Sequence, residues 1–261
     1  MAAPAAVLWL ASGAGAASAV DLIQMQSRGS LRALVASDEE PEMFSLAPSG
    51  PVGLEREMLE GFARLHGVKL QPVVVKGFED IIPALLNEEG DLIVGIRDTE
   101  SRRKVIDFTT ETLPARDVVV TRKPHRVVMT AQDLQAEKVG VASGTSWGDS
   151  AIAAGVPEAR IETLPDLPAA LEALRQGKIS ATVMSLFDFT LMARRNPDLQ
   201  AGLLLGLPGS AAWGVRKSSP KLRQALSDYV ESLRKTASWS RLVLQYFGPD
   251  ALTALGRART R

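Results

Sequence analysis

The chain contains no cysteine, and it has only two histidines, His66 and His125, among its 261 residues. The absence of cysteine excludes disulfides and thiol catalysis, and the scarcity of both residue types excludes zinc sites built from Cys and His. We therefore expect no metal and no cofactor, and histidine-dependent catalysis is disfavoured. Because no disulfide can form, cysteine usage carries no information on the redox compartment.

An excess of charge of either sign is also absent. Lys plus Arg number 30 and Asp plus Glu number 30, so there is no electrostatic case for a nucleic acid or an anionic membrane surface as partner. Aromatic residues make up only 5% of the chain, but hydrophobic residues reach 46% and charged residues 23%, which is typical of a globular protein with a substantial core. A chain of this length suffices for one large domain or two modest ones.

The N-terminal segment has no charge at all. Residues 3–19, APAAVLWLASGAGAASA, end in an Ala-x-Ala pattern typical of a secretory signal and its cleavage site, although the usual basic segment is missing. We predict that residues 1–19 are a signal peptide that directs export. The alternative is a short apolar helix that stays attached and tethers the protein to a membrane. No other stretch is apolar and long enough to span a bilayer.

Strand-like and helix-like segments alternate through the rest of the chain. Strand character at residues 31–37 and 91–96 is separated by helical patterns such as residues 53–67. The same order returns between residues 138 and 196. Such alternation is typical of mostly parallel α/β sheets, and its repetition predicts two lobes with a sheet in each. Two extended stretches, 115–125 and 211–219, predict that the chain crosses between the lobes twice.

These patterns define the expected domain organisation. We assign residues 31–119 and 213–248 to lobe 1 and residues 121–207 to lobe 2. Within lobe 1, residues 220–247 have the pattern of an amphipathic helix. Residues 249–261 are expected to form a C-terminal tail.

Five segments keep a characteristic order along the chain: GPVGLEREMLEGFARLHGVKL, ALLNEEGDLIVGIRDTESRRKVIDFT, KVGVASGTSWGDSA, LRQGKISATVMS and SPKLRQALSDYVESLRK. Together they resemble the bacterial extracellular solute-binding proteins of family 3, the amino-acid-type periplasmic receptors of ABC importers. The resemblance extends over residues 31–248. The stretch GKISATVMSLFDFTLMARRNPDL is particularly similar to the solute-binding-like domain of membrane-bound lytic transglycosylase F.

The resemblance implies a type II periplasmic-binding-protein fold, in which two α/β lobes clamp a ligand at two hinge crossings. It implies a periplasmic, monomeric protein without enzymatic activity, whose partners are a small anionic or zwitterionic ligand and an ABC permease. A ligand-sensing module like that of the transglycosylase remains open. A dehydratase-type enzyme is less favoured, because the motifs contain no nucleophile–base pair and only Asp98 or Glu42 as a general acid.

A strand that ends on arginine marks the first half of the predicted site. The strand that contains Gly95 runs directly into Arg97 and Asp98, and ligands of open α/β sheets bind at such carboxyl ends. Arginine presents a fixed fork of donors that matches a carboxylate. By the resemblance, Arg102 holds the ligand's carboxylate, and we include all four residues in the site. The basic residues that follow Arg102 are assigned to the surface.

The loop SGTSWGDS supplies the second half of the predicted site. Free N–H groups at Thr145 and Ser146 can receive an anion at the start of a helix, although simple capping explains these residue types equally well. In the family this loop contacts the carboxylate. Trp147 either lines the cleft or packs within its lobe. Phe44, with its neighbour Met43, matches an aromatic position of the family, and it either forms the upper wall of the cleft or belongs to the core.

Two positions depart from the family pattern. Members that bind free amino acids usually carry Ser or Thr where Arg97 stands, and an acid that pairs with the ligand's ammonium where Ser185 stands. An unpaired buried charge is costly, so one added guanidinium and one missing carboxylate predict a preference for carboxylate-rich or peptide-like ligands. Asp98 and Asp188 are alternative acids, but we place Asp188 on the surface.

Overall fold

The structure, a computed structural model, describes residues 20–259. The predicted signal peptide at residues 1–19 lies outside the described residues. Within the described part, no helix is long and apolar enough to cross a membrane. The helix α1 (Val20–Arg28) follows directly, and it packs on the folded protein through the buried side chain of Met25.

Nine strands of the described chain form one sheet in the order β2-β1-β3-β9-β5-β8-β6-β7, with β4 paired to β9. The strands are β1 (Ser30–Ala36), β2 (Lys69–Val75), β3 (Leu92–Arg97), β4 (Ile106–Phe108), β5 (Leu113–Arg122), β6 (Val139–Ala142), β7 (Ile161–Leu164), β8 (Ala181–Ser185) and β9 (Leu199–Arg216). The pairs β1·β2, β1·β3, β6·β7 and β6·β8 are parallel. All pairs that involve β9 or β5 are antiparallel.

The helices are α2 (Pro41–Phe44), α3 (Leu54–Leu65), α4 (Ile81–Leu86), α5 (Glu100–Arg103), α6 (Ala131–Gln135), α7 (Trp147–Ala153), α8 (Leu167–Arg175), α9 (Leu186–Arg195), α10 (Pro220–Arg234), α11 (Ala237–Phe247) and α12 (Asp250–Arg259). Two short 3-10 turns, η2 (Phe78–Asp80) and η3 (Glu158–Arg160), complete the chain. The helical face predicted within α3 is buried at Leu54, Met58 and Phe62, but Leu65 at its end is exposed.

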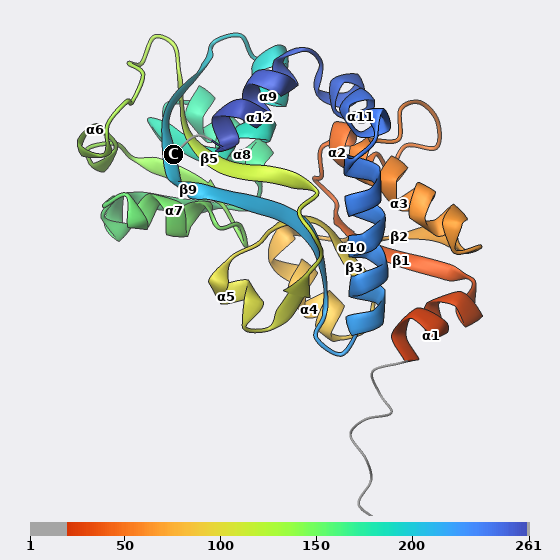
Figure 1. Cartoon of the computed structure of the whole chain (residues 1–261). Coiled ribbons are helices and arrows are strands. Elements are labelled where there is room, and N and C mark those ends of the chain that lie inside the picture. The colour runs from red at the N-terminus through yellow and green to blue at the C-terminus, as the bar shows by residue number, and fades with distance from the viewer. Residues whose placement is uncertain (1–19, 260–261) are drawn as a thin grey trace, which may run out of the picture.

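The two long strands β5 and β9 run side by side through the middle of the molecule and connect its two parts (Figure 1). We call β1–β4 with α1–α5 and α10 lobe 1, and β6–β8 with α6–α9 lobe 2. The sheet is continuous, although the sequence favoured a separate sheet in each lobe, because β9 pairs with β3 and β4 as well as with β5, which in turn pairs with β8. The residue boundaries of the lobes stay a prediction.

The C-terminal region differs from its predicted form. The expected amphipathic helix is two helices, α10 and α11, separated by Lys235 and Thr236. The expected tail contains the helix α12, which lies beside α9 at the edge of lobe 2 (Figure 1). Ala251, Ala254 and Ala258 of α12 are buried. Small side chains on one helical face let α12 approach α9 and β5 closely, so this segment belongs to the packed structure.

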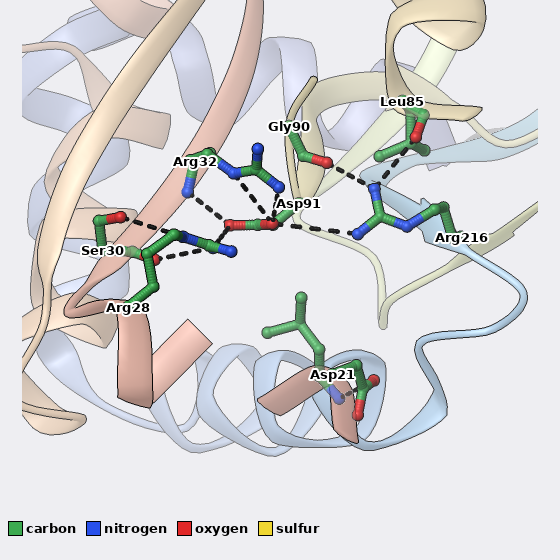
Figure 2. A network of polar contacts seen from close by, with 9 residues as sticks. Asp21, Arg28, Ser30, Arg32, Leu85, Gly90, Asp91 and Arg216 are labelled. Atoms are coloured by element: carbon green, nitrogen blue, oxygen red, sulfur yellow. Dashed lines mark hydrogen bonds and ion pairs between the residues drawn. The ribbon is translucent and has the colours of Figure 1, made fainter. Parts of the chain in front are cut away.

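A buried carboxylate ties the start of β3 to three arginines, which come from α1, β1 and the end of β9 (Figure 2). The side chain of Asp91 is 5% exposed, and its Oδ1 accepts a hydrogen bond from Arg32 Nη2 at 2.8 Å. Its Oδ2 accepts from the Arg32 backbone N–H at 2.8 Å and from Arg28 Nη2. Arg216 Nη2 lies 3.9 Å from Oδ1. One aspartate thus joins α1, β1, β3 and the end of β9.

Candidate functional site

A cavity lies between the lobes, where β1 and β3 end opposite the loop that follows β6 and the start of α9. It holds about 1050 Å³ of empty space, part of it open to solvent, which is large enough for a small molecule. Its charged lining consists of two arginines and six carboxyl-bearing residues: Arg97, Arg102, Asp38, Glu39, Glu40, Asp117, Asp166 and Asp188.

Arg102 reaches across this cavity from lobe 1 to lobe 2. Thr99 caps α5 by accepting from the Arg102 backbone N–H at 3.3 Å, so the helix begins immediately after β3 and directs Arg102 toward the cavity. The guanidinium donates from Nη1 to the Arg97 carbonyl and from Nη2 to the Gly144 carbonyl, both at 2.9 Å. It also lies 5.5 Å from the ring centroid of Phe78.

The charge of Arg102 has no counter-ion at contact distance among residues 20–259. The residue is only 9% exposed, and burial lowers the pKa of its guanidinium to about 10, so it stays charged at neutral pH. A buried charge with only neutral partners is costly. Arg102 is therefore the group in the cavity that most favours an anion.

Arg97, in contrast, is already paired. Its Nη1 lies 3.1 Å from Oδ1 of Asp117, whose side chain is fully buried. The other oxygen, Oδ2, accepts from Ser150 Oγ at 2.5 Å. Burial raises the pKa of Asp117, and the Arg97 charge opposes that effect. Asp117 stands directly opposite Ser185 in the β5·β8 pair, so an acid on the neighbouring strand lies beside the position where the family pattern carries one.

Ser185 ends β8 and caps α9 by accepting from the Asp188 backbone N–H at 3.0 Å. This cap places Asp188 in the first turn of α9, where it lines the cavity. The expectation that Asp188 lies on the surface is therefore wrong. Burial raises the pKa of its carboxyl to about 6, the Ser185 hydrogen bond opposes this, and the nearby Glu40 carboxylate raises it further.

Three consecutive acids, Asp38, Glu39 and Glu40, follow β1 and form one wall of the cavity. Glu40 is paired across the lobes with Arg195 of α9 at 2.8 Å. Glu39 has no arginine or lysine partner in the described chain; burial raises its pKa to about 8, and the Asp188 carboxylate contributes to the same effect. Burial also raises the pKa of Asp38.

The predicted excess of positive charge in the cleft is therefore wrong. The charge of Arg97 is balanced by Asp117, and the acid missing at Ser185 is outnumbered by carboxyl groups from β1, β5, α8 and α9 that line the same space. Sequence analysis named Asp188 but placed it on the surface, and it did not single out the other acids. Asp117 lies within β5, directly after Arg116 and before the apolar residues 118–120.

The loop between β6 and α7 closes the cavity from lobe 2. Gly144 has a φ of +72°, and a Cβ there would lie 2.4 Å from the backbone nitrogen of Glu79 in lobe 1. Only glycine allows this approach. Thr145 lines the cavity and donates to the Ala142 carbonyl at 2.7 Å. Trp147 lines the cavity and also packs on both neighbouring core clusters, and its contact with a ligand stays a prediction.

Most of the predicted site residues line the cavity: Gly95, Arg97, Arg102, Thr145, Ser146, Trp147 and Ser185. Phe44 and Asp98 do not. Phe44 is 1% exposed and lies in the core, whereas its neighbour Met43 faces the cavity. Asp98 accepts from Arg103 Nε at 2.6 Å, and neither of these two residues lines the cavity. Successive residues at a strand end point to opposite faces, so Arg97 and Asp98 cannot both face the ligand.

A fully buried carboxyl lies behind the cavity wall at Gly95. Glu55 of α3 accepts from Thr112 Oγ1 at 2.9 Å and from the indole N–H of Trp213. A Cβ added at Gly95 would lie 3.6 Å from Glu55 Oε1. Burial raises the pKa of Glu55 to about 7, although both hydrogen bonds favour its ionised form.

Glu55 should make the stability of the protein depend on pH. Its pKa rises from 4.5 to about 7 on folding, so the stabilisation from protonated Glu55 is complete below the lower value and is lost as the pH rises through the higher one. We expect Glu55→Gln to remove about 3 kcal/mol of this pH dependence. Urea unfolding across the same pH range measures it. Glu60→Gln is the control, since the Glu60 side chain on α3 is 30% exposed and is paired with Arg56. Identical profiles for the wild type and Glu55→Gln would contradict the prediction.

The fold and the cavity together define a two-lobed binding protein of the α/β class. The chain belongs to the bacterial extracellular solute-binding proteins, family 3, whose sequence pattern matches residues 31–249. Family members of this kind act outside the cytoplasm, in the periplasm or at the cell surface. The predicted family and fold class are thus confirmed.

Three curated relatives illustrate the range of the family. A probable histidine-binding protein of Campylobacter jejuni is 28% identical over 56% of this chain and 57% of its own length. Membrane-bound lytic murein transglycosylase F of Desulfosudis oleivorans is 23% identical over 92% of this chain, but only 55% of the transglycosylase. The L-cystine-binding protein TcyJ of Escherichia coli is 24% identical over 88% of this chain and 86% of TcyJ. The chain therefore spans little more than half the length of the first two.

Solved structures show the same architecture. A mutant of ArgBP from T. maritima superimposes with a TM-score of 0.78, at 25% identity, and covers 87% of this chain and 99% of ArgBP. The arginine-bound form of a truncated ArgBP gives a TM-score of 0.73 at 25% identity over 81% of this chain and 99% of the ArgBP chain. An amino acid-binding protein that preceded cyclohexadienyl dehydratase, at 22% identity and a TM-score of 0.77, shows the fold alone.

Proposed function

We propose that this protein is a periplasmic solute-binding protein that clamps a small carboxylate-bearing ligand between its lobes and delivers it to an ABC permease. The observation that carries the proposal is Arg102, a buried guanidinium that faces the cavity and forms no ion pair with a carboxylate among residues 20–259. The relatives that bind histidine, cystine or arginine support a ligand of amino-acid type. We propose a monomer, since one chain supplies both walls of the cavity.

The contacts of Arg102 suggest how the ligand would be held. The guanidinium already bridges to the Gly144 carbonyl of lobe 2, so a carboxylate bound to its free N–H groups would lie next to Thr145 and Ser146. Such a ligand would touch both lobes at once. Binding would then favour conformations in which the two lobes lie close together, because a ligand shifts the population toward the state that it binds more tightly.

A thermal-shift screen of the whole protein tests the proposal. Amino acids, dicarboxylates and short peptides at 100 times their Kd should stabilise the fold by about 2.7 kcal/mol and raise Tm by about 5–10 °C. Amines of the same size without a carboxylate should have much smaller effects. A screen in which no carboxylate-bearing compound raises Tm would contradict the proposed function.

Two other functions have specific support. The similarity to transglycosylase F over 92% of this chain favours a ligand-sensing module; uptake assays in cells with and without the protein separate transport from sensing. A dehydratase-type activity has one observation in its favour: burial raises the pKa of Glu39 to about 8, a value that suits a general acid as long as no cation is bound beside it. His66 and His125 do not line the cavity, and we rank this activity last.

A further inference from the structure

The cavity has two chemically distinct ends. Arg102 extends from lobe 1 next to the Gly144 loop, and acids from the end of β1 and the first turn of α9 supply the remaining charge. The charges of Arg97 and Glu40 are each balanced by a neighbouring side chain, Asp117 and Arg195. These two pairs contribute no net charge for a ligand to meet.

When these two pairs are set aside, the described residues that line the cavity include one arginine, Arg102, and several acids. Asp166 is used as the N-cap of α8, where it accepts from the Ala169 backbone N–H at 2.7 Å. Asp38, Glu39 and Asp188 remain, and none of them forms an ion pair with an arginine or lysine of the described chain. A ligand that matches this arrangement has a single carboxylate and more than one cationic group.

The position of Asp188 explains how the chain replaces the acid that the family pattern carries at Ser185. Ser185 holds the first turn of α9 through its hydrogen bond to the Asp188 backbone. The Asp188 carboxylate therefore faces the cavity one helical turn beyond Ser185. Asp117, the other nearby acid, is already bonded to Arg97 and Ser150, so Asp188 is the acid available to an ammonium group.

We propose that Asp188 binds the ammonium group of the ligand and that Asp38 and Glu39 bind a second cationic group, so that the ligand is a basic amino acid or a derivative of one. The proposal rests on the proposed function, because Arg102 still holds the carboxylate end. It reverses the ligand preference expected from Arg97 and Ser185.

The electrostatic state of the three acids supports this assignment. Burial raises the pKa of all three carboxyls, and mutual repulsion between Glu39 and Asp188 adds to the rise at Glu39. A cation bound among them would offset both effects. A ligand with a second carboxylate would increase the repulsion, and a neutral side chain would leave it unchanged.

Isothermal titration of the whole protein with four matched ligands tests the charge preference without any variant. L-Arginine and L-citrulline have nearly the same shape but differ in one positive charge. We expect L-arginine to bind at least about 10-fold more tightly than L-citrulline, and L-glutamate to bind more weakly than both. Agmatine, which lacks the carboxylate, should also bind more weakly than L-arginine. Equal or tighter binding of L-citrulline or L-glutamate would overturn the proposal.

Variants then assign the individual groups. Asp188→Asn should weaken L-arginine and L-citrulline alike by about 10-fold or more, because both carry the α-ammonium. The double variant Asp38→Asn/Glu39→Gln should weaken only L-arginine, to the level of L-citrulline. Asp98→Asn, which changes an acid outside the cavity, is the matched control. Unchanged L-arginine affinity in Asp188→Asn, with urea unfolding like the wild type, would contradict the assignment of Asp188.

The outcomes separate this inference from the proposed function. If L-glutamate binds tightly and Arg102→Ala abolishes its binding, the carboxylate site stands and the inferred basic ligand is wrong. If no carboxylate-bearing ligand binds at all, the proposed function is wrong, and the inference falls with it.

Discussion

Replacing Arg102 with alanine should weaken ligand binding by about 2–5 kcal/mol, the range observed when one partner of a buried charge pair is removed. The expected loss is large because Arg102 is 9% exposed and faces the cavity without an ion pair to any carboxylate in the described part of the chain. Titration calorimetry with the ligand found in the thermal-shift screen measures it. Arg102→Lys keeps the charge but loses the fork of donors, and it should recover only part of the affinity.

Arg103 provides the matched control on the same short helix. Its side chain is 67% exposed and is paired with Asp98, so Arg103→Ala should change ligand affinity by less than about 0.5 kcal/mol. Equal effects of Arg102→Ala and Arg103→Ala would mean that neither residue contacts the ligand. A similar loss in Arg102→Ala and Arg102→Lys would indicate that geometry, rather than charge alone, holds the carboxylate.

Replacing Asp91 with alanine should lower the free energy of unfolding by about 3 kcal/mol, near the lower end of the range for breaking a buried ion pair. Three arginines would then lie close together without their shared carboxylate (Figure 2). The arginine side chains are 16% to 36% exposed, so water would offset part of their repulsion, and we do not expect the full penalty of a dry site. Urea unfolding monitored by circular dichroism measures the change.

Asp107 is a suitable control for Asp91. It forms an ion pair with Arg223 at 3.6 Å, and its side chain is 32% exposed, so Asp107→Ala should cost less than about 1 kcal/mol. Neither aspartate lines the cavity, and ligand affinity at a temperature where both variants are folded should match the wild type. A comparable loss of stability in both variants would contradict the special role of Asp91.

The sequence by itself determined the elements and one side of the site. The periodicity of apolar residues set α3 and β3 within a residue or two, because a helix of period 3.6 and a buried strand leave distinct local patterns. The family resemblance, and not spacing alone, selected Arg102, and the structure shows local features that set its position. β3 ends on Arg97, Thr99 caps the next turn, and the turn carries Arg102 back over the strand end.

Tertiary structure decided the charge of the cavity. Asp117 pairs with Arg97 although the two residues lie on different strands, and Asp188 faces the same space from a helix of the other lobe. No periodicity relates such residues, since their meeting depends on how the crossing strands bring the lobes together. The sequence prediction counted only Arg97 and Ser185, and it therefore gave the wrong sign for the charge of the cavity.

Side-chain direction was the other feature that only the folded chain fixed. Met43 and Phe44 are adjacent, as are Arg97 and Asp98, yet in each pair only the first residue lines the cavity. Neighbouring residues point in different directions, so a shift of one residue moves a side chain from the cavity to the core or to solvent. The packing of α2 and of the continuous sheet decides which residue faces the cavity. The sequence thus determined which segments surround the cavity, and the packing of the lobes determined which of their side chains line it.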